Sequence, residues 1–242
     1  MSLWLASVQV ARKHVRSTVL QSAGALVVGH RGGRGEGWPR ENTLAAFERA
    51  RAEGARAIEL DVRTCGTGEV VVLHDPTGSS LAELRALGVP TLAEALAGAC
   101  ENDVAVNVEL KHDVPNRLVL VERVRRVLRP SRADVLLSSF DPLLLAAAAV
   151  ALPATRRALL TSRAQRPQVP SAIATSPFVH ALHLERTQTN PATIGRYRRR
   201  GLRVGVWTVN DPREAADLVA LGVETLITDA PGVLLEALTP GK

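Results

Sequence analysis

The sequence of 242 residues predicts an α/β protein built as one (β/α)8 TIM barrel. From residue 25 onward, short runs rich in Val, Ile and Leu alternate with longer amphipathic segments, which is typical of βαβ units and a parallel sheet. Eight such runs lie within about 215 residues, matching the size and strand count of this barrel. A doubly wound open sheet is the alternative, but residues 29–37 lack the G-x-G-x-x-G spacing typical of that fold.

Each strand prediction rests on one apolar run, and the runs are 25–30, 57–62, 103–110, 134–139, 156–161, 181–185, 203–208 and 224–228. A further short run, Val70–Leu73, follows a glycine-containing turn. Helices are predicted where a capping residue precedes a proline or an apolar start, at 44–53, 143–151, 192–200 and 213–221. Residues 152–180 contain four prolines, so outside the run 156–161 we expect a loop with a short helix.

We expect residues 1–24 to form an N-terminal extension and residues 25–238 to form the barrel domain. Polar residues interrupt the apolar stretch of the extension, and no small-residue cleavage site follows it, so a signal peptide is not expected. The two cysteines, Cys65 and Cys100, exclude a disulfide framework and a four-cysteine zinc site. These features favour a reducing, cytoplasmic setting.

The formal charge of +6 comes almost entirely from arginine, and we interpret it as a bias of composition. Nucleic acid is not expected as a partner because aromatic residues make up only 3% of the chain and zinc-finger spacing is lacking. Stable membrane insertion is not expected, since no run approaches the roughly 20 apolar residues that cross a bilayer. The composition leaves the oligomeric state open.

Polar residues end most of the predicted strands, where active sites of such barrels lie. Glu59 and Asp61 share one face of their strand because they are two residues apart, and so do Glu109 and Lys111. Converging carboxylates repel one another unless a cation lies among them, and oxygen ligands favour Mg2+ or Ca2+ over zinc. The alternative for Glu59 and Asp61 is an ion pair with arginines that closes the barrel.

His30 and His74 follow strand candidates beside these carboxylates. The unperturbed pKa of imidazole lies near neutral pH, so the two suit a general acid and a general base, with a structural role as the alternative. Arg31 lies between His30 and Gly32 and is suited to bidentate binding of a phosphate. No role is assigned to His14, His112 or His180.

Nine short motifs follow one another along the chain: Gly29-His30-Arg31-Gly32, Glu41-Asn42-Thr43-Leu44, Glu59-Leu60-Asp61-Val62, His74-Asp75, Val89-Pro90-Thr91-Leu92 with Glu94, Glu109-Leu110-Lys111, Ser139-Phe140-Asp141, Val206-Trp207-Thr208-Val209-Asn210 and Ile227-Thr228-Asp229-Ala230-Pro231. In this order, over about residues 25–238, the sequence resembles the glycerophosphodiester phosphodiesterase family.

The resemblance implies a barrel enzyme that hydrolyses a small-molecule phosphodiester, a glycerophosphodiester, to sn-glycerol 3-phosphate and an alcohol. It implies that Glu59, Asp61 and Glu109 bind one divalent cation, Mg2+ or Ca2+. It further implies that His30 and His74 are the catalytic acid and base.

The resemblance also implies four substrate-binding residues. Arg31 and Lys111 would hold the phosphate, and Glu41 would lie close to the metal or the glycerol hydroxyls. Trp207 would form an apolar wall of the glycerol pocket, with ordinary barrel packing as the alternative.

The sequence departs from the family pattern after the second barrel strand. The family usually carries a longer insertion between the positions of His74 and Pro90, and here it is much reduced. A more open mouth would admit bulkier diesters. The alternative functions are therefore a lysophospholipase D-like phosphodiesterase on the same barrel and a barrel that binds phosphate ligands without catalysis.

Overall fold

The computed structural model describes residues 24–163, 176 and 178–239. Its strands are β1 Leu26–Gly29, β2 Ala57–Thr64, β3 Val70–Val72, β4 Ala105–Leu110, β5 Val135–Ser139, β6 Arg156–Thr161, β7 Ala181–Glu185, β8 Arg203–Trp207 and β9 Thr225–Thr228. They form one sheet in the order β1-β9-β8-β7-β6-β5-β4-β2-β3, and β1 also pairs with β2. This last pairing closes eight parallel strands into a barrel, so the predicted (β/α)8 fold is confirmed.

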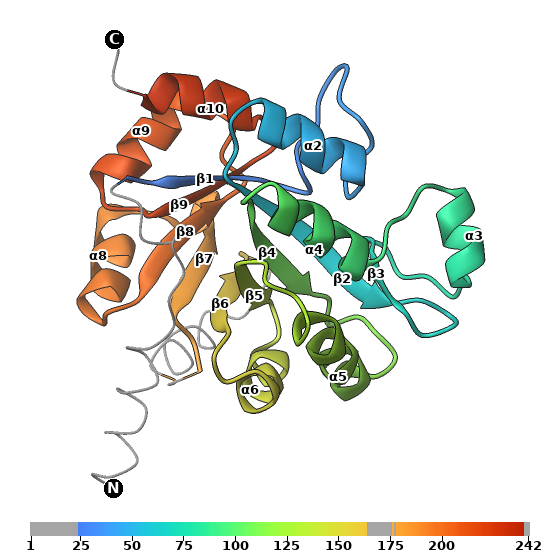
Figure 1. Ribbon diagram of the computed structural model, residues 1–242. Helices are drawn as coiled ribbons and strands as arrows, with labels where there is room; N and C mark the ends of the chain where they lie inside the picture. The colour runs from blue at the N-terminus through green and yellow to red at the C-terminus, as the bar shows by residue number, and fades with distance from the viewer. Residues whose placement is uncertain (1–23, 164–175, 177, 240–242) are drawn as a thin grey trace, which may run out of the picture.

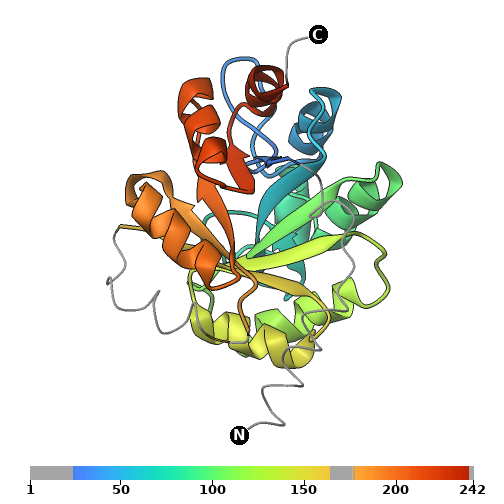
Figure 2. The ribbon, with the colours of Figure 1, turned by 90° about the vertical axis from the view of Figure 1, so that its left-hand side faces the viewer.

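Helices surround the barrel on the outside, as Figures 1 and 2 show. They are α2 Leu44–Ala52, α3 Leu81–Ala86, α4 Leu92–Glu101, α5 Arg117–Leu128, α6 Pro142–Ala151, α8 Pro191–Arg199, α9 Pro212–Ala220 and α10 Pro231–Leu238. The four predicted helices correspond to α2, α6, α8 and α9. Their N-cap residues are those expected from the sequence, since the side chains of Thr43, Asp141, Asn190 and Asp211 each accept a hydrogen bond from a backbone N–H of the first turn.

The main hydrophobic core lies between the barrel and this ring of helices. Side chains alternate along each strand, so Leu60 and Val62 of β2 point outward and are fully buried against helix residues such as Leu96. Glu59 and Asp61, which alternate with these two residues in the sequence, then point to the inside of the barrel. The alternation of β2 thus places a carboxylate at two successive inward positions.

The segment after β2 is short. β3 pairs antiparallel with β2, which confirms the additional strand expected at residues 70–73, and one six-residue helix, α3, follows it. A capping box between Ser80 and Glu83 begins α3, which lies beyond the arrowhead of β2 in Figure 1.

Several expectations fall wholly or partly outside the described residues. The N-terminal extension, which contains His14, is described only at Gly24. Much of the loop expected within residues 152–180 is also outside them, including any short helix in 164–175. Within the described part of the chain, no helix combines the length and the apolar composition required for a membrane span.

Candidate active site

Three carboxylates converge inside the barrel at the carboxyl ends of β2 and β4. Glu59, Asp61 and Glu109 each present an oxygen within 4.8 Å of the others, and all three side chains are buried. The parallel pairing of the two strands causes this convergence, because it sets Asp61 directly beside Glu109. The structure therefore brings together the three residues predicted to bind a metal.

Burial and mutual repulsion make this group electrostatically unfavourable without a cation. Burial, together with the charges of Asp61 and Glu109, raises the pKa of Glu59 well above its usual value. Burial and the charge of Asp61 raise the pKa of Glu109 to about 7. Burial acts in the same direction on Asp61, but the nearby Lys111 and Arg31 outweigh it, so the pKa of Asp61 is lowered.

Lys111 and Arg31 partly neutralise the three acids. The Nζ atom of Lys111 lies 3.2 Å from Oδ1 of Asp61 and 3.0 Å from Oε1 of Glu109. The Nε atom of Arg31 lies 3.1 Å from Oδ2 of Asp61, and its backbone N–H donates to Oε2 of Glu59 at 3.0 Å. The ion pairing that the sequence offered as an alternative to metal binding is thus present at Asp61.

Two residues of the loop after β1 adopt left-handed backbone conformations to make these contacts. Arg31 has φ +52° and Asn42 has φ +58°, a backbone region that residues other than glycine seldom occupy. Asn42 donates through Nδ2 to Oδ2 of Asp61 at 2.8 Å, and its Oδ1 accepts from the backbone N–H of Asp61 at 3.3 Å. The loop conformation therefore serves the orientation of Asp61.

His30 is held by the buried carboxylate of Asp229, which directly follows β9. Its Nδ1 lies 2.7 Å from Oδ1 of Asp229, and its Nε2 lies 3.9 Å from Oε2 of Glu59. Asn210 donates to the other oxygen of Asp229 at 3.0 Å. Burial acts to raise the pKa of Asp229, but hydrogen bonds from His30 and Asn210 outweigh it and lower the pKa to about 2. This carboxylate stays charged and directs Nε2 of His30 towards Glu59.

His74 is more exposed than His30. Its Nδ1 lies 2.7 Å from Oδ1 of Asp75, a side chain that is 85% exposed, and His74 itself is 40% exposed. Its backbone carbonyl oxygen accepts a hydrogen bond from the guanidinium of Arg63. The two histidines thus differ in how their imidazoles are supported.

A cavity of about 180 Å3 joins these groups. Its lining residues are His30, Arg31, Glu59, His74, Glu109, Lys111, Phe140, Leu160, Trp207 and Ile227. Phe140 meets Trp207 edge to face, with 5.5 Å between the ring centroids, so the polar groups are accompanied by an aromatic wall.

Trp207 and Glu41 occupy different positions relative to this cavity. Trp207 lines it and also packs against the hydrophobic cluster that contains Val28 and Ile227, so both interpretations of Trp207 have a structural basis. Glu41 is absent from the cavity lining; instead its Oε1 accepts from a terminal guanidinium nitrogen of Arg31 at 2.6 Å.

Comparison with known proteins identifies the family of this chain. Residues 30–87 and 78–233 match the family model described as the glycerophosphoryl diester phosphodiesterase family. The chain belongs to this family. A glycerophosphodiester phosphodiesterase of Caldanaerobacter subterraneus is 27% identical in an alignment of 243 positions that covers 89% of this chain and 98% of that relative.

Solved structures agree with the fold. The Thermotoga maritima glycerophosphodiester phosphodiesterase has a TM-score of 0.72 at 25% identity, covering 89% of this chain and 99% of that one. A phosphodiesterase of Oleispira antarctica has a TM-score of 0.81 at 23% identity, covering 91% of this chain and 99% of its own. As a member of the glycerophosphoryl diester phosphodiesterase family, this chain is a phosphoric diester hydrolase that acts on glycerophosphodiesters.

The carboxylate group fits the divalent cation expected for this phosphodiesterase family. All three donors are oxygen atoms, as Mg2+ and Ca2+ prefer. Oε1 of Glu109 is buried and makes no well-aligned hydrogen bond within the described residues, although Nζ of Lys111 lies close to it. A positive ion at this point would also relieve the repulsion that raises the pKa of Glu59.

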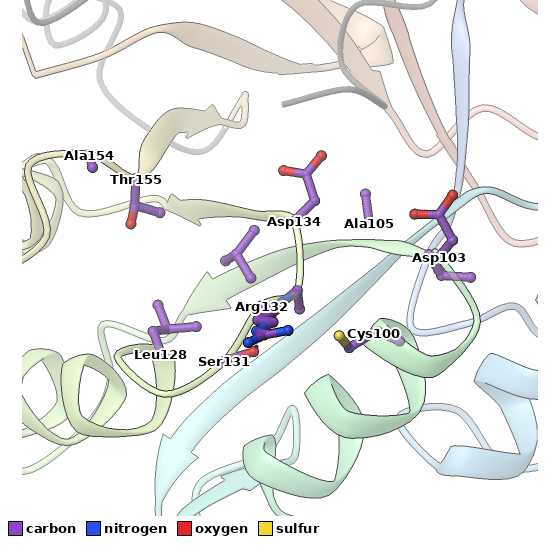
Figure 3. A pocket seen from close by; sticks show the side chains of 13 residues that line it. Cys100, Asp103, Ala105, Leu128, Ser131, Arg132, Asp134, Ala154 and Thr155 are labelled. Atoms are coloured by element: carbon purple, nitrogen blue, oxygen red, sulfur yellow. Dashed lines mark hydrogen bonds between the residues drawn. The ribbon is translucent and has the colours of Figure 1, made fainter. Parts of the chain in front are cut away.

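A larger cavity, of about 410 Å3, lies at the opposite, amino-terminal end of the strands. Figure 3 shows its lining, which includes Cys100, Asp103, Arg132 and Asp134. None of the residues predicted for catalysis lines it. The smaller cavity at the carboxyl ends is therefore the candidate active site of this phosphodiesterase, as the barrel fold requires.

Sequence reasoning gave no role to several residues that shape the site. These are Asn42, Arg63, Phe140, Asn210 and Asp229. All except Arg63 lie within or at the end of the motifs that carry the family resemblance, and Asp229 ends a predicted strand. Their positions in the motifs and at strand ends could thus have pointed to these residues. The contacts that each residue makes are visible only in the closed barrel.

Proposed function

We propose that the chain converts glycerophosphodiesters to sn-glycerol 3-phosphate and an alcohol in the cavity lined by His30 and His74. One observation supports this proposal above all: two imidazoles, two cationic side chains and two buried carboxylates line the same cavity of about 180 Å3. Phosphodiester hydrolysis needs neutralised phosphate charge and proton transfer at two oxygens, and this set supplies both. The Oleispira antarctica phosphodiesterase was solved with its product sn-glycerol 3-phosphate.

Glu59, Asp61 and Glu109 would hold one divalent cation, either Mg2+ or Ca2+. When bound, the cation would supply positive charge to the non-bridging phosphate oxygens. Arg31 and Lys111 both line the cavity and both contact Asp61, and they would contact the phosphate from the protein side. Glu41 would fix the Arg31 guanidinium rather than contact the substrate directly.

The two histidines are proposed to have separate proton-transfer roles. His30 is the more buried, and its Nε2 is free to accept a proton because Nδ1 donates to Asp229, so His30 is suited to activate the attacking oxygen. His74 lies at the exposed rim, where the alcohol must leave, so it is suited to donate a proton to the departing alkoxide. Trp207 and Phe140 would pack against the carbon chain of the glycerol.

The test compares hydrolysis of glycerophosphocholine and lysophosphatidylcholine by the purified chain. Enzymatic detection of choline follows both reactions, and detection of sn-glycerol 3-phosphate identifies the first. We expect turnover of glycerophosphocholine that chelation abolishes and that falls at least about 100-fold in His30→Ala and His74→Ala. His112→Ala, an exposed histidine beside Phe140, is the matched control and should retain activity.

Turnover of lysophosphatidylcholine alone would favour the lysophospholipase D alternative. Full activity of both histidine variants would contradict the proposed site. A second substrate separates the two histidines: glycerol phosphate esterified to p-nitrophenol has a leaving group that needs no proton. It should therefore restore activity to His74→Ala and leave His30→Ala inactive.

A further inference from the structure

Arg63 lies beneath the turn that carries His74. It follows Glu59 and Asp61 at alternate positions of β2, so all three side chains are on one face of the strand. The Arg63 side chain is only 2% exposed. A guanidinium cannot lose its proton at ordinary pH, so a buried arginine requires fixed acceptors around it.

The acceptors of Arg63 come from two different loops. Its Nε donates to the carbonyl oxygen of Leu73 at 3.2 Å, and a terminal nitrogen donates to the carbonyl oxygen of His74. The same terminal nitrogen contacts both carboxylate oxygens of Asp113, at 3.1 and 3.3 Å. Asp113 lies two residues after Lys111, so Arg63 connects the loop of His74 to the loop that follows Lys111.

The imidazole of His74 has weak support from its own side-chain partner. Asp75 is 85% exposed, and ion pairs that are exposed to water contribute little to stability. His30 differs, because its partner Asp229 is only 11% exposed. The position of the His74 imidazole must therefore depend mainly on its backbone, and Arg63 binds that backbone at two successive carbonyls.

We propose that Arg63, together with Asp113, is a positioning residue for His74. The pair holds the Leu73–His74 backbone so that the imidazole faces the cavity. This inference rests on the proposed function for the catalytic role of His74, but the contact itself is independent of that role. It assigns to Arg63 no contact with substrate or metal.

The first test is a set of double-mutant cycles on glycerophosphocholine hydrolysis, with radiolabelled substrate for slow variants. Arg63→Lys keeps the charge but loses the planar fork, and we expect kcat to fall about 10- to 100-fold with little change in KM. In the His74→Ala background the same substitution should change kcat less than about twofold. In the His30→Ala background it should keep its full effect. Equal losses in both backgrounds would overturn the proposal.

Two further readouts separate positioning from general damage to the fold. With the p-nitrophenyl substrate, which needs no proton donor, the loss in Arg63→Lys should largely disappear. Binding of Mg2+ or Ca2+ measured by calorimetry should match the wild type. A parallel loss of metal affinity would show that Arg63 acts through Asp61 instead. Arg85→Lys, at an exposed arginine paired with Glu94, is the matched control and should be unchanged in every assay.

Asp113→Asn keeps the test decisive if Arg63→Lys does not fold, because Asp113 is 43% exposed and tolerant of substitution. Spectra of the protein labelled at histidine carbons should show a shifted or broadened His74 signal in this variant and an unchanged His30 signal. Unchanged signals for both would contradict the proposal. This spectrum needs no substrate. It therefore distinguishes a failure of Arg63 and Asp113 to position His74 from a failure of the proposed function.

Discussion

The side chains of His30 and Asp229 meet at 2.7 Å although 199 positions separate them in the sequence. His30 directly follows β1 and Asp229 directly follows β9, and these two strands pair in parallel. The pairing of β1 with β9 thus also brings Asp229 to the histidine that we propose to be catalytic. Arg34 adds a further contact to Asp229, with its Nε 3.0 Å from Oδ1.

Asp229→Asn should lower kcat about 100-fold, because the amide no longer fixes the Nδ1–H tautomer of His30. The matched control is Asp75→Asn, which alters the corresponding contact of His74 at an exposed side chain. We expect the control to lose less than about fivefold, since exposed ion pairs contribute little. Steady-state kinetics on both variants test this, and equal losses would contradict the importance given to burial.

Glu59→Gln should make the metal-free protein more stable and unresponsive to metal. The amide removes one of three mutually repelling buried carboxylates and can still accept the hydrogen bond from the Arg31 backbone. We expect the free energy of unfolding to rise by about 1 to 2 kcal/mol without metal. The wild type should gain about 2.7 kcal/mol from metal at 100 times its Kd, and the variant should gain almost nothing.

Urea denaturation with and without Mg2+ or Ca2+ measures both effects of Glu59→Gln. Glu48→Gln, at an exposed helix residue, is the control and should leave stability within about 0.5 kcal/mol. A less stable metal-free Glu59→Gln protein would indicate that the carboxylates stabilise the barrel by ion pairing instead.

His183 should make the barrel sensitive to acid. It is fully enclosed in the barrel interior, where a side chain at Gly205 would collide with its ring, and burial lowers its pKa to about 4. Above the unfolded pKa of 6.5 neither state is protonated, so the residue adds no pH dependence there. Below pH 6.5 the unfolded chain binds a proton at His183 and the folded chain does not. Stability therefore falls as the pH drops from 6.5 towards 4.

The resulting loss of stability at about pH 5 is roughly 2 kcal/mol relative to neutral pH. His183→Leu should remove that part of the pH dependence, as urea denaturation at both pH values would show. His112→Asn, at an exposed histidine, should retain it. An unchanged pH dependence in His183→Leu would show that His183 takes up its proton over the same pH range in the folded and unfolded states.

Two substitutions of Trp207 distinguish a substrate wall from barrel packing. Its ring faces Phe140 in the cavity, while its Nε1 donates to the carbonyl oxygen of His183 at 3.1 Å. Trp207→Phe keeps an apolar ring and loses the hydrogen bond, so we expect lower stability with KM within about twofold. Trp207→Ala should also raise KM about tenfold through lost apolar contact. An unchanged KM in Trp207→Ala would leave packing as its function.

Local rules were sufficient for the parts of the site that lie on regular strands. The alternation of β2 and β4 put Glu59, Asp61 and Glu109 on inward faces, and strand polarity put them at one end of the barrel. Capping residues followed by proline located α6, α8 and α9, because the caps act within a few residues of the helix start.

Contacts between distant segments were not accessible in this way. Asp229 was visible as a polar strand end, but its pairing with His30 depends on the closure of β1 against β9. The sequence predicts phosphate binding by Arg31, whereas its guanidinium also contacts Glu41 and Asp61. Such partners follow from loop conformations, including a positive φ at Arg31, that no periodic pattern encodes.

The most direct measurement of the central claim is a calorimetric titration of the chelator-treated protein with Mg2+ and with Ca2+, followed by assay of the same samples. One ion per chain should bind, and glycerophosphocholine hydrolysis should return in proportion to its occupancy. Glu109→Gln should bind at least about tenfold more weakly and remain inactive. Unaltered binding in Glu109→Gln, or full hydrolysis by the metal-free wild type, would contradict the assignment of Glu59, Asp61 and Glu109 as the metal site.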